Sequence, residues 1–161
     1  MEESITLKDF LGFYKKTMEM GPVDAGTYSP LVLAYIGDAV YEVMIRAKVI
    51  NKGSIQVKRL QKRSAELVKA GTQAAMIRLL EEDLTEEEHA VYKRGRNAKS
   101  ATMAKHATMV DYRTATGFEA LVGWLFLEER FDRLTELVSL GLTKIGAMET
   151  KTTPAPEQKG E

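Results

Sequence analysis

Apolar and polar residues follow helical spacing along nearly the whole chain. Residues 5–20 form a short amphipathic segment, and "GPVDAGTYSP" (21–30) then interrupts the pattern with two Gly and two Pro. Ser29-Pro30 is a typical helix start, with Ser as the N-cap and Pro at the first helical position. This pattern predicts a helix from 30 to about 49 that ends at "NKG" (51–53).

The middle of the chain predicts three more helices. The first begins near Ser54 or Ile55, and a break near Gly71 separates it from a helix in "TQAAMIRLLEE" (72–82). Thr85-x-x-Glu88 has the spacing of a capping box, which predicts a helix from 86 to about 94.

The C-terminal third predicts a loop, a long helix and a tail. "RGRNAKSA" (94–101) has the composition of a loop, and the main helix is expected from 118 to about 146 with a bend near Arg130. Residues 149–161 have almost nothing to bury and are expected to be disordered. No alternating pattern is long enough for a sheet. We therefore predict an all-α protein with an N-terminal extension (1–28), one helical domain (29–148) and a tail (149–161).

Composition limits the class of protein. The 161 residues suffice for one compact domain, and 44% apolar with 29% charged residues is ordinary for a globular chain. The absence of Cys excludes disulfides and thiolate zinc sites and favours a reducing compartment. We see no signal peptide pattern and no apolar run long enough for a membrane span, so a cytoplasmic location without membrane contact is expected.

Charge is segregated although the 23 basic and 23 acidic residues cancel. Residues 81–88 hold six acids. Two flanking segments, 43–65 and 93–106, carry basic residues and no acid, and they include Arg46, Lys48, Lys58, Arg59, Lys62, Arg63, Lys93, Arg94, Arg96, Lys99 and Lys105. Local charge attracts phosphates, so a nucleic-acid partner stays open, although lysines on an outer helix face are more often only solvated.

Asp38 is the only charged residue between Ser29 and Tyr41. A carboxylate in an apolar helix is costly to bury without a partner, so we expect an Arg or Lys from another helix, water at a subunit edge, or a divalent metal. Gly37 beside it costs about 1 kcal/mol relative to Ala within a helix, which indicates a close backbone approach at a helix crossing or a dimer interface. Glu42 is expected where the helix emerges into solvent.

Glu119 raises the same question in a second apolar helix. Thr116-x-x-Glu119 fits a capping box, which needs no metal. However, Gly123 lies four residues beyond Glu119, so two helices each carry one carboxylate and one Gly on an apolar surface. Two carboxylates from facing helices can hold Mg²⁺, which takes few protein ligands and keeps several waters.

Other catalytic classes lack their residues. The chain has two His and no Cys, and it contains no HExxH, GxSxG, GxGxxG or P-loop motif. The segment around Arg94 to Ser100 combines Arg and Lys, which contact phosphates, with Asn and Ser, which can bind backbone oxygens or 2′-hydroxyls.

Three motifs together resemble the ribonuclease III family. "AYIGDAVYE" (34–42) is similar to the signature helix of that family, and "GFEALVGWLFL" (117–127) is similar to its second metal-binding helix. "RGRNAKS" (94–100) between them resembles the Mini-ribonuclease III form, which lacks a double-stranded-RNA-binding domain. The resemblance runs from about Ser29 to about Leu140.

The resemblance implies a helical endonuclease domain that acts as a homodimer. It implies Mg²⁺-dependent cleavage of double-stranded RNA, with Mn²⁺ as a substitute ion, and maturation of the ends of 23S ribosomal RNA precursor, with a ribosomal protein as a further partner. Asp38 and Glu119 would be the catalytic metal ligands. The expected interface residues are Tyr35, Ile36, Gly37 and Val40, and the expected RNA-binding residues are Lys62, Arg63, Arg94, Arg96, Asn97, Lys99 and Ser100.

The sequence departs from the four-acid pattern of longer family members. Ala34 and Thr116 stand at two of the acidic positions, so only Asp38 and Glu119 remain. The short subfamily resembles this chain in that reduction, which indicates one well-held Mg²⁺ per site. The alternatives are a non-catalytic RNA-binding ribosome-assembly factor on the same fold and a helical protein–protein adaptor.

Overall fold

The computed structural model describes residues 6–51, 53–99 and 108–148, and within these ranges it contains helices and no strands. The predicted all-α class is confirmed. The predicted disordered tail (149–161) lies outside the described residues. The α-helices are α1 (Leu7–Thr17), α2 (Pro30–Ile50), α3 (Val57–Val68), α4 (Ala70–Leu80), α5 (Glu86–Asn97), α6 (Met109–Leu127) and α7 (Phe131–Lys144), and short 3₁₀ turns cover Ala25–Thr27 and Glu81–Asp83.

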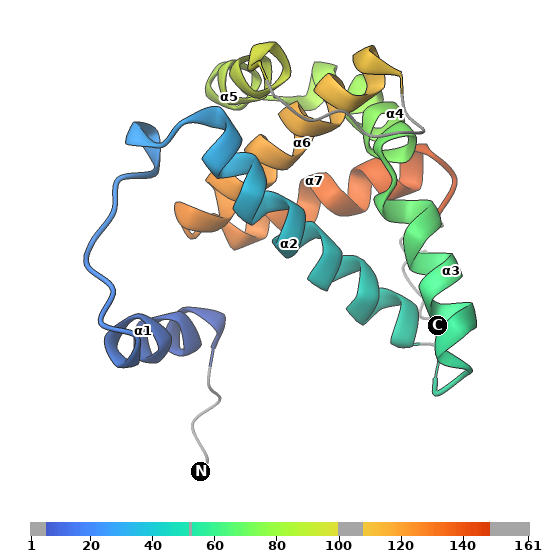
Figure 1. Ribbon diagram of the computed structural model, residues 1–161, viewed down its shortest axis with the longest axis horizontal. Coiled ribbons are helices and arrows are strands. Elements are labelled where there is room, and N and C mark those ends of the chain that lie inside the picture. The colour runs from blue at the N-terminus through green and yellow to red at the C-terminus, as the bar shows by residue number, and fades with distance from the viewer. Residues whose placement is uncertain (1–5, 52, 100–107, 149–161) are drawn as a thin grey trace, which may run out of the picture.

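Helix α6 forms the centre of the fold because it packs against α2, α4, α5 and α7 (Figure 1). Its middle turns bury residues on all sides, from Phe118 to Leu125 with the exception of Glu119. A helix that is apolar all round is expected where neighbours cover every face. The first helix, α1, follows a different course and lies at the end of an extended connection (Figure 1).

Two predicted helix starts are confirmed at the level of the cap. The Ser29 hydroxyl accepts a hydrogen bond from the Val32 amide at 3.3 Å. At α5, the Thr85 hydroxyl accepts from the Glu88 amide and the Glu88 carboxylate accepts from the Thr85 amide, at 3.2 and 2.9 Å. Side-chain caps of this kind satisfy amides that the first helical turn leaves unpaired.

Three predicted boundaries are wrong. The segment from Arg94 to Asn97 is not a loop, because α5 continues to Asn97. Helix α6 begins after an N-cap at Thr108 rather than near 118, so Thr116 lies in mid-helix and its hydroxyl donates to the Tyr112 carbonyl. The expected bend near Arg130 is a full break between α6 and α7, where Glu129 adopts φ 56°.

Gly95 explains why α5 continues. A Cβ at this position would lie 2.8 Å from the Ala120 Cβ and 2.9 Å from the Gly117 Cα, both on α6. The missing side chain therefore lets the last turn of α5 pack directly on α6. A Gly normally weakens a helix by about 1 kcal/mol, but here its small size permits the tertiary contact.

Glu88 joins α5 to α7 through a buried ion pair. Its carboxylate accepts two hydrogen bonds from the Arg133 guanidinium, at 2.8 and 2.9 Å, while the glutamate is only 1% exposed. Burial alone would raise the pKa of Glu88, but the hydrogen bonds from Arg133 and Thr85 bring it below its ordinary value. Glu88, which was predicted only as a capping residue of α5, therefore also links α5 to α7.

The closest helix contact is the crossing of α2 and α6. A Cβ at Gly37 would collide with the Glu119 carbonyl and lie 2.7 Å from the Gly123 amide nitrogen. A Cβ at Gly123 would collide with the Leu33 carbonyl and lie 3.0 Å from the Gly37 amide nitrogen. Each glycine therefore accommodates the backbone of the opposite helix. Of the two explanations that the sequence left for Gly37, the tight helix crossing within one chain is correct.

No described helix combines the length and the apolar character that a membrane span requires.

Gly37→Ala tests the crossing. We expect it to lower the free energy of unfolding by about 3 kcal/mol, because the new methyl group meets backbone atoms that cannot move without separating the helices. Gly71→Ala on α4 is the matched control, since nothing lies within 4 Å of its added Cβ, and it should change stability by no more than about 1 kcal/mol. Urea unfolding followed by circular dichroism measures both. Equal stabilities would contradict this account of the crossing.

Candidate functional site

The glycine crossing brings Asp38 and Glu119 to one place. Asp38 follows Gly37 on α2, and the backbone of Glu119 lies directly against Gly37. Glu119 is half-buried between α6 and its neighbours, whereas Asp38 is exposed. The like charge of Asp38 acts on the Glu119 carboxyl. The two predicted site residues are therefore neighbours, although 81 positions separate them in the chain.

The surroundings of both carboxyl groups raise their pKa values. Burial, followed by the charge of Asp38, raises the pKa of Glu119 to about 8, although a hydrogen bond from the Gln73 side chain acts in the opposite direction. Partial burial, followed by the charge of Glu42, raises the pKa of Asp38. No cation among the described protein groups offsets this repulsion. Paired carboxyl groups with raised pKa values are a common feature of functional sites.

The exposed side chain of Asp38 is compatible with two of the three explanations suggested by the sequence, water at a subunit edge and a divalent metal. The expectation that Asp38 is buried is wrong, because its side chain reaches the surface of the single chain. Within the described residues it makes no ion pair with Arg or Lys, so the simplest structural explanation does not apply. The capping-box explanation for Glu119 also fails, since Thr116 lies within α6 and bonds to the Tyr112 carbonyl. Neither carboxylate has a purely structural partner of the expected kind.

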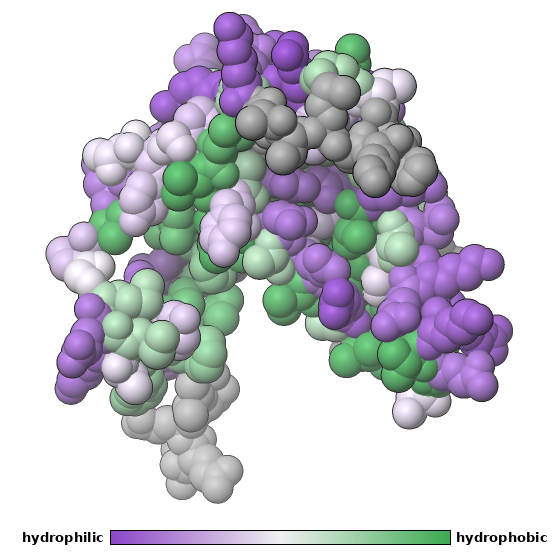
Figure 2. All heavy atoms as spheres, viewed as in Figure 1, coloured by the Kyte–Doolittle hydropathy of each residue, from purple (hydrophilic) through white to green (hydrophobic). Residues whose placement is uncertain are grey.

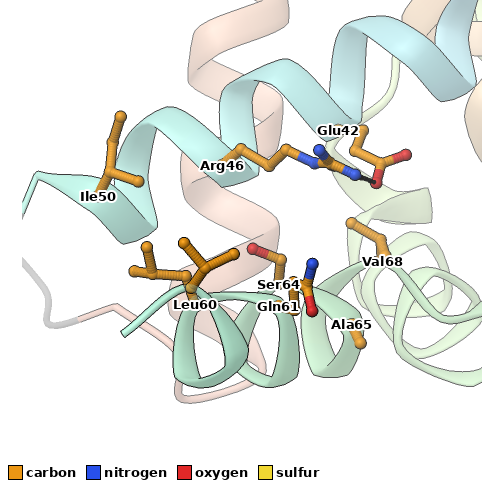
Figure 3. Close-up of a pocket in the computed structure, with 9 residues that line it drawn as sticks. Glu42, Arg46, Ile50, Leu60, Gln61, Ser64, Ala65 and Val68 are labelled. Atoms are coloured by element: carbon orange, nitrogen blue, oxygen red, sulfur yellow. Dashed lines mark hydrogen bonds and ion pairs between the residues drawn. The ribbon is translucent and has the colours of Figure 1, made fainter. Parts of the chain in front are cut away.

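Glu42 lies one turn along α2 and belongs to a different interaction. Its carboxylate pairs with Arg46 at 2.7 Å (Figure 3). Both residues line a groove of about 460 Å³ between α2 and α3, together with Gln61, Ser64 and Val68. Glu42 is thus at the edge of this groove, in line with the expectation that the helix emerges into solvent there.

The basic residues fall into two separate groups. Lys62 and Arg63 are exposed on α3, while Arg94, Asn97 and Lys99 are exposed at the end of α5. Figure 1 places these two helices at different ends of the molecule. Since Gly95 packs on Ala120, the basic turn of α5 lies beside the α6 segment that carries Glu119. The α5 group is therefore close to the candidate site.

Arg96 differs from its neighbours because protein groups already contact it. Its guanidinium lies 3.8 Å from the Glu81 carboxylate and 5.3 Å from the centre of the Tyr92 ring. These contacts hold the guanidinium against the protein, and the RNA-binding role of Arg96 stays a prediction. Ser100, also expected to bind RNA, lies outside the described residues.

The oxygen atoms of Asp38 and Glu119 suit a hard divalent cation that takes few ligands from the protein. No cluster of three or more Asp, Glu, His or Cys side chains occurs within the described ranges, so among these residues the acidic contribution to the site is the pair Asp38 and Glu119. Ala34 is 5% exposed and forms part of the core. A third polar group completes the surroundings: Gln73 of α4 is 1% exposed, and its Oε1 atom has no partner among the described residues. An oxygen ligand set of this size suits Mg²⁺ or Mn²⁺.

Gln73 is the residue that sequence reasoning missed. It occupies an apolar stretch, "AGTQAAMIRLL", in which the neighbours Ala74, Met76 and Ile77 are fully buried. The available signal was weaker than for Asp38, since Gln73 is one of several polar residues in a mainly apolar helix. Only the packing of α4 against α6 shows that Gln73 reaches Glu119.

The predicted interface residues lie along one side of α2. Tyr35 is 84% exposed, and Ile36 and Val40 are partly exposed. The expectation for Gly37 is wrong, because this residue faces α6 of the same chain and cannot admit a partner. Ile36 and Val40 line an apolar groove of about 440 Å³ that also contains Phe10, Val43 and Phe126. Figure 2 shows hydrophobic side chains along the hollow between the side of the molecule that holds α1 and the side that holds α3.

Comparison with known proteins gives a consistent result. The Ribonuclease III domain matches residues 31–130. Mini-ribonuclease 3 of Clostridium tetani is 49% identical over 118 residues, which cover 73% of this chain and 78% of that protein. Mini-ribonuclease 3 of Enterococcus faecalis is 45% identical over 75% of this chain and 93% of that protein. A crystal structure of a Fusobacterium nucleatum protein superposes with a TM-score of 0.68 at 28% identity, over 73% of this chain and 90% of that one.

The chain belongs to the Mini-ribonuclease 3 branch of the ribonuclease III family. It is an endoribonuclease, as the matched domain and these relatives establish. This membership decides against the adaptor and the non-catalytic assembly factor. Asp38 and Glu119 both lie within the part of the chain that matches the Ribonuclease III domain.

The raised pKa of Glu119 predicts a pH dependence of stability without metal. In the unfolded chain a Glu ionises near pH 4.5, whereas here the pKa is about 8, so the folded chain binds more protons between these values. The free energy of unfolding in EDTA should therefore fall as pH rises from 4.5 to 8 and then level off. Glu119→Gln should flatten this part of the curve, because its amide cannot ionise. Identical slopes for wild type and variant in urea melts would refute the assignment.

Proposed function

We propose that this endoribonuclease cuts both strands of double-stranded RNA with a divalent cation, Mg²⁺ or Mn²⁺, held by Asp38 and Glu119. The observation that carries the proposal is the pair itself: two carboxylates meet at the α2–α6 crossing, and burial, followed by a neighbouring carboxylate, raises the pKa of each. A divalent ion removes that repulsion more effectively than a single proton.

Each carboxylate has a distinct task in this proposal. Glu119, half-buried on the central helix, is the fixed ligand, since α6 is enclosed by its neighbours. Asp38 is exposed and faces the solvent from which RNA arrives. A bound ion would supply Lewis acidity and an activated water at this position. Water adds across the P–O3′ bond, which leaves a 5′-phosphate on one product and a 3′-hydroxyl on the other.

The α5 basic turn is the proposed RNA contact nearest to the site. Arg94, Asn97 and Lys99 are exposed there, beside the part of α6 that carries Glu119. Such side chains bind phosphate and sugar oxygens and fix the position of a duplex without reading its sequence. Lys62 and Arg63 on α3 would contact a more distant part of the duplex. The proposed substrate is a structured precursor, with the ends of 23S ribosomal RNA as the biological case and a ribosomal protein as a further partner.

A second copy of the chain is the proposed occupant of the apolar side of α2. Tyr35 and Val43 are 84% and 68% exposed, and they adjoin the apolar groove between α1, α2 and α7. Contiguous apolar surface of this kind marks an interaction site. A homodimer would place two candidate sites on one duplex, one for each strand.

Cleavage of a long perfect RNA duplex tests the nuclease site. We expect wild type to cut with Mg²⁺ and not with EDTA, and Asp38→Ala or Glu119→Ala to lose at least about 100-fold in rate, because each change removes a proposed ligand. Asp132→Ala, which alters an exposed aspartate on α7, is the control and should cut normally. Wild-type rates in both site variants would show that the reaction takes place elsewhere.

Sedimentation equilibrium tests the proposed dimer. Wild type should have twice the chain mass, and Val43→Lys should weaken association at least about tenfold, since a buried ammonium group would lack a partner. Val57→Lys on α3 is a close control, because Val57 is exposed to a similar degree, 65% against 68%. A monomeric wild type, or equal dissociation constants for both variants, would count against α2 as the interface.

A further inference from the structure

Gln73 is a buried polar residue with an incomplete set of hydrogen bonds. Its amide nitrogen Nε2 donates to the Val68 carbonyl at 2.8 Å. The Gln73 side chain also lowers the pKa of Glu119, and this effect must come from Nε2, because only this atom of Gln73 can donate to a carboxylate. The carbonyl atom Oε1 has no partner among the described residues, and the whole residue is 1% exposed.

The orientation of the amide follows from these contacts. A primary amide has two N–H donors: one bonds to the Val68 carbonyl, and the other is left to act on the Glu119 carboxylate. Rotating the amide by half a turn would place Oε1 against the Val68 carbonyl and lose that bond. The unpartnered atom is therefore Oε1 rather than Nε2. An unsatisfied buried carbonyl costs about 1–3 kcal/mol, so a native protein is expected to provide a partner that the polypeptide alone does not.

The position of Oε1 identifies the class of partner. It shares one carbon with Nε2, the atom that acts on Glu119, so it belongs to the surroundings of that carboxylate where α4 packs on α6. The partner must donate a hydrogen bond or carry positive charge, and it must fit beside two carboxylates. Water bound to a divalent cation meets all of these requirements, because such an ion retains several waters that are strong donors.

We propose that Gln73 is a positioning residue of the cation site: Nε2 fixes the Glu119 carboxylate, and Oε1 accepts a hydrogen bond from a water on the bound divalent ion. This inference rests on the proposed function, since it requires that Asp38 and Glu119 hold the ion. It adds a third residue, from a third helix, to a site with two carboxylates. The anchor at Val68 ties the site to the junction of α3 and α4.

Mn²⁺ titration of the RNA-free protein, followed by electron paramagnetic resonance, is the decisive measurement. Gln73→Met, which keeps the length and removes every polar atom, should weaken Mn²⁺ binding about 10-fold or more, as loss of an outer-sphere partner does. Its urea unfolding midpoint in EDTA should stay close to that of wild type, because the unsatisfied oxygen is removed with the donors. A residue with only a structural role would show the reverse, a loss of stability with unchanged Mn²⁺ affinity.

Controls separate this inference from the proposed function. Gln61→Met, at an exposed glutamine on α3, should leave Mn²⁺ binding unchanged. If Asp38→Ala abolishes Mn²⁺ binding and Gln73→Met has no effect, the role of Gln73 is refuted and the site stands. If wild type shows no binding that depends on Asp38, both fail. Gln73→Leu repeats the comparison should the Met variant not fold.

Discussion

The contact of α2 with α6 at Gly37 and Gly123 is the constraint on which the rest of the fold depends. Each glycine lies against backbone atoms of the opposite helix, so the two axes approach more closely than any pair of larger residues would allow. Helix α6 can then be covered on its other faces by α4, α5 and α7. At Gly95 the same device recurs between α5 and α6, which shows that small residues determine how this helix is enclosed.

The same closeness creates the electrostatic character of the site. Asp38 adjoins one of the crossing glycines, and Glu119 contributes the carbonyl against which that glycine packs. A crossing with larger residues would separate the carboxylates and reduce their repulsion, but it would also remove the geometry needed to share an ion. The raised pKa of Glu119 is therefore a consequence of the helix packing, through its burial and the charge of Asp38, and it is a cost that metal-free protein carries.

The success of sequence reasoning varied with the range of the interactions involved. The caps at Ser29 and Thr85 were predictable because their hydrogen bonds join residues three positions apart. Asp38 and Glu119 were recognisable as charges in apolar helices. The continuation of α5 to Asn97 was not predictable, because Gly95 signals a break unless its contact with Ala120 is known. Likewise, Thr116-x-x-Glu119 satisfied the local rule for a cap, and only the helix start at Thr108 removes that explanation.

The two positions that lack the family's acids are consistent with a site of low charge. Ala34 is buried in the core, where a carboxylate would be costly to desolvate, and Thr116 uses its hydroxyl within α6. Two carboxylates carry a charge of about −2 when both are ionised, which one divalent cation neutralises. A further cation would need oxygens beyond the two carboxylates that the described residues bring together, and RNA phosphates are the natural source. The reduction from four acids to two therefore lowers repulsion in the metal-free fold, and it gives neutral donors such as Gln73 a larger share in holding the site together.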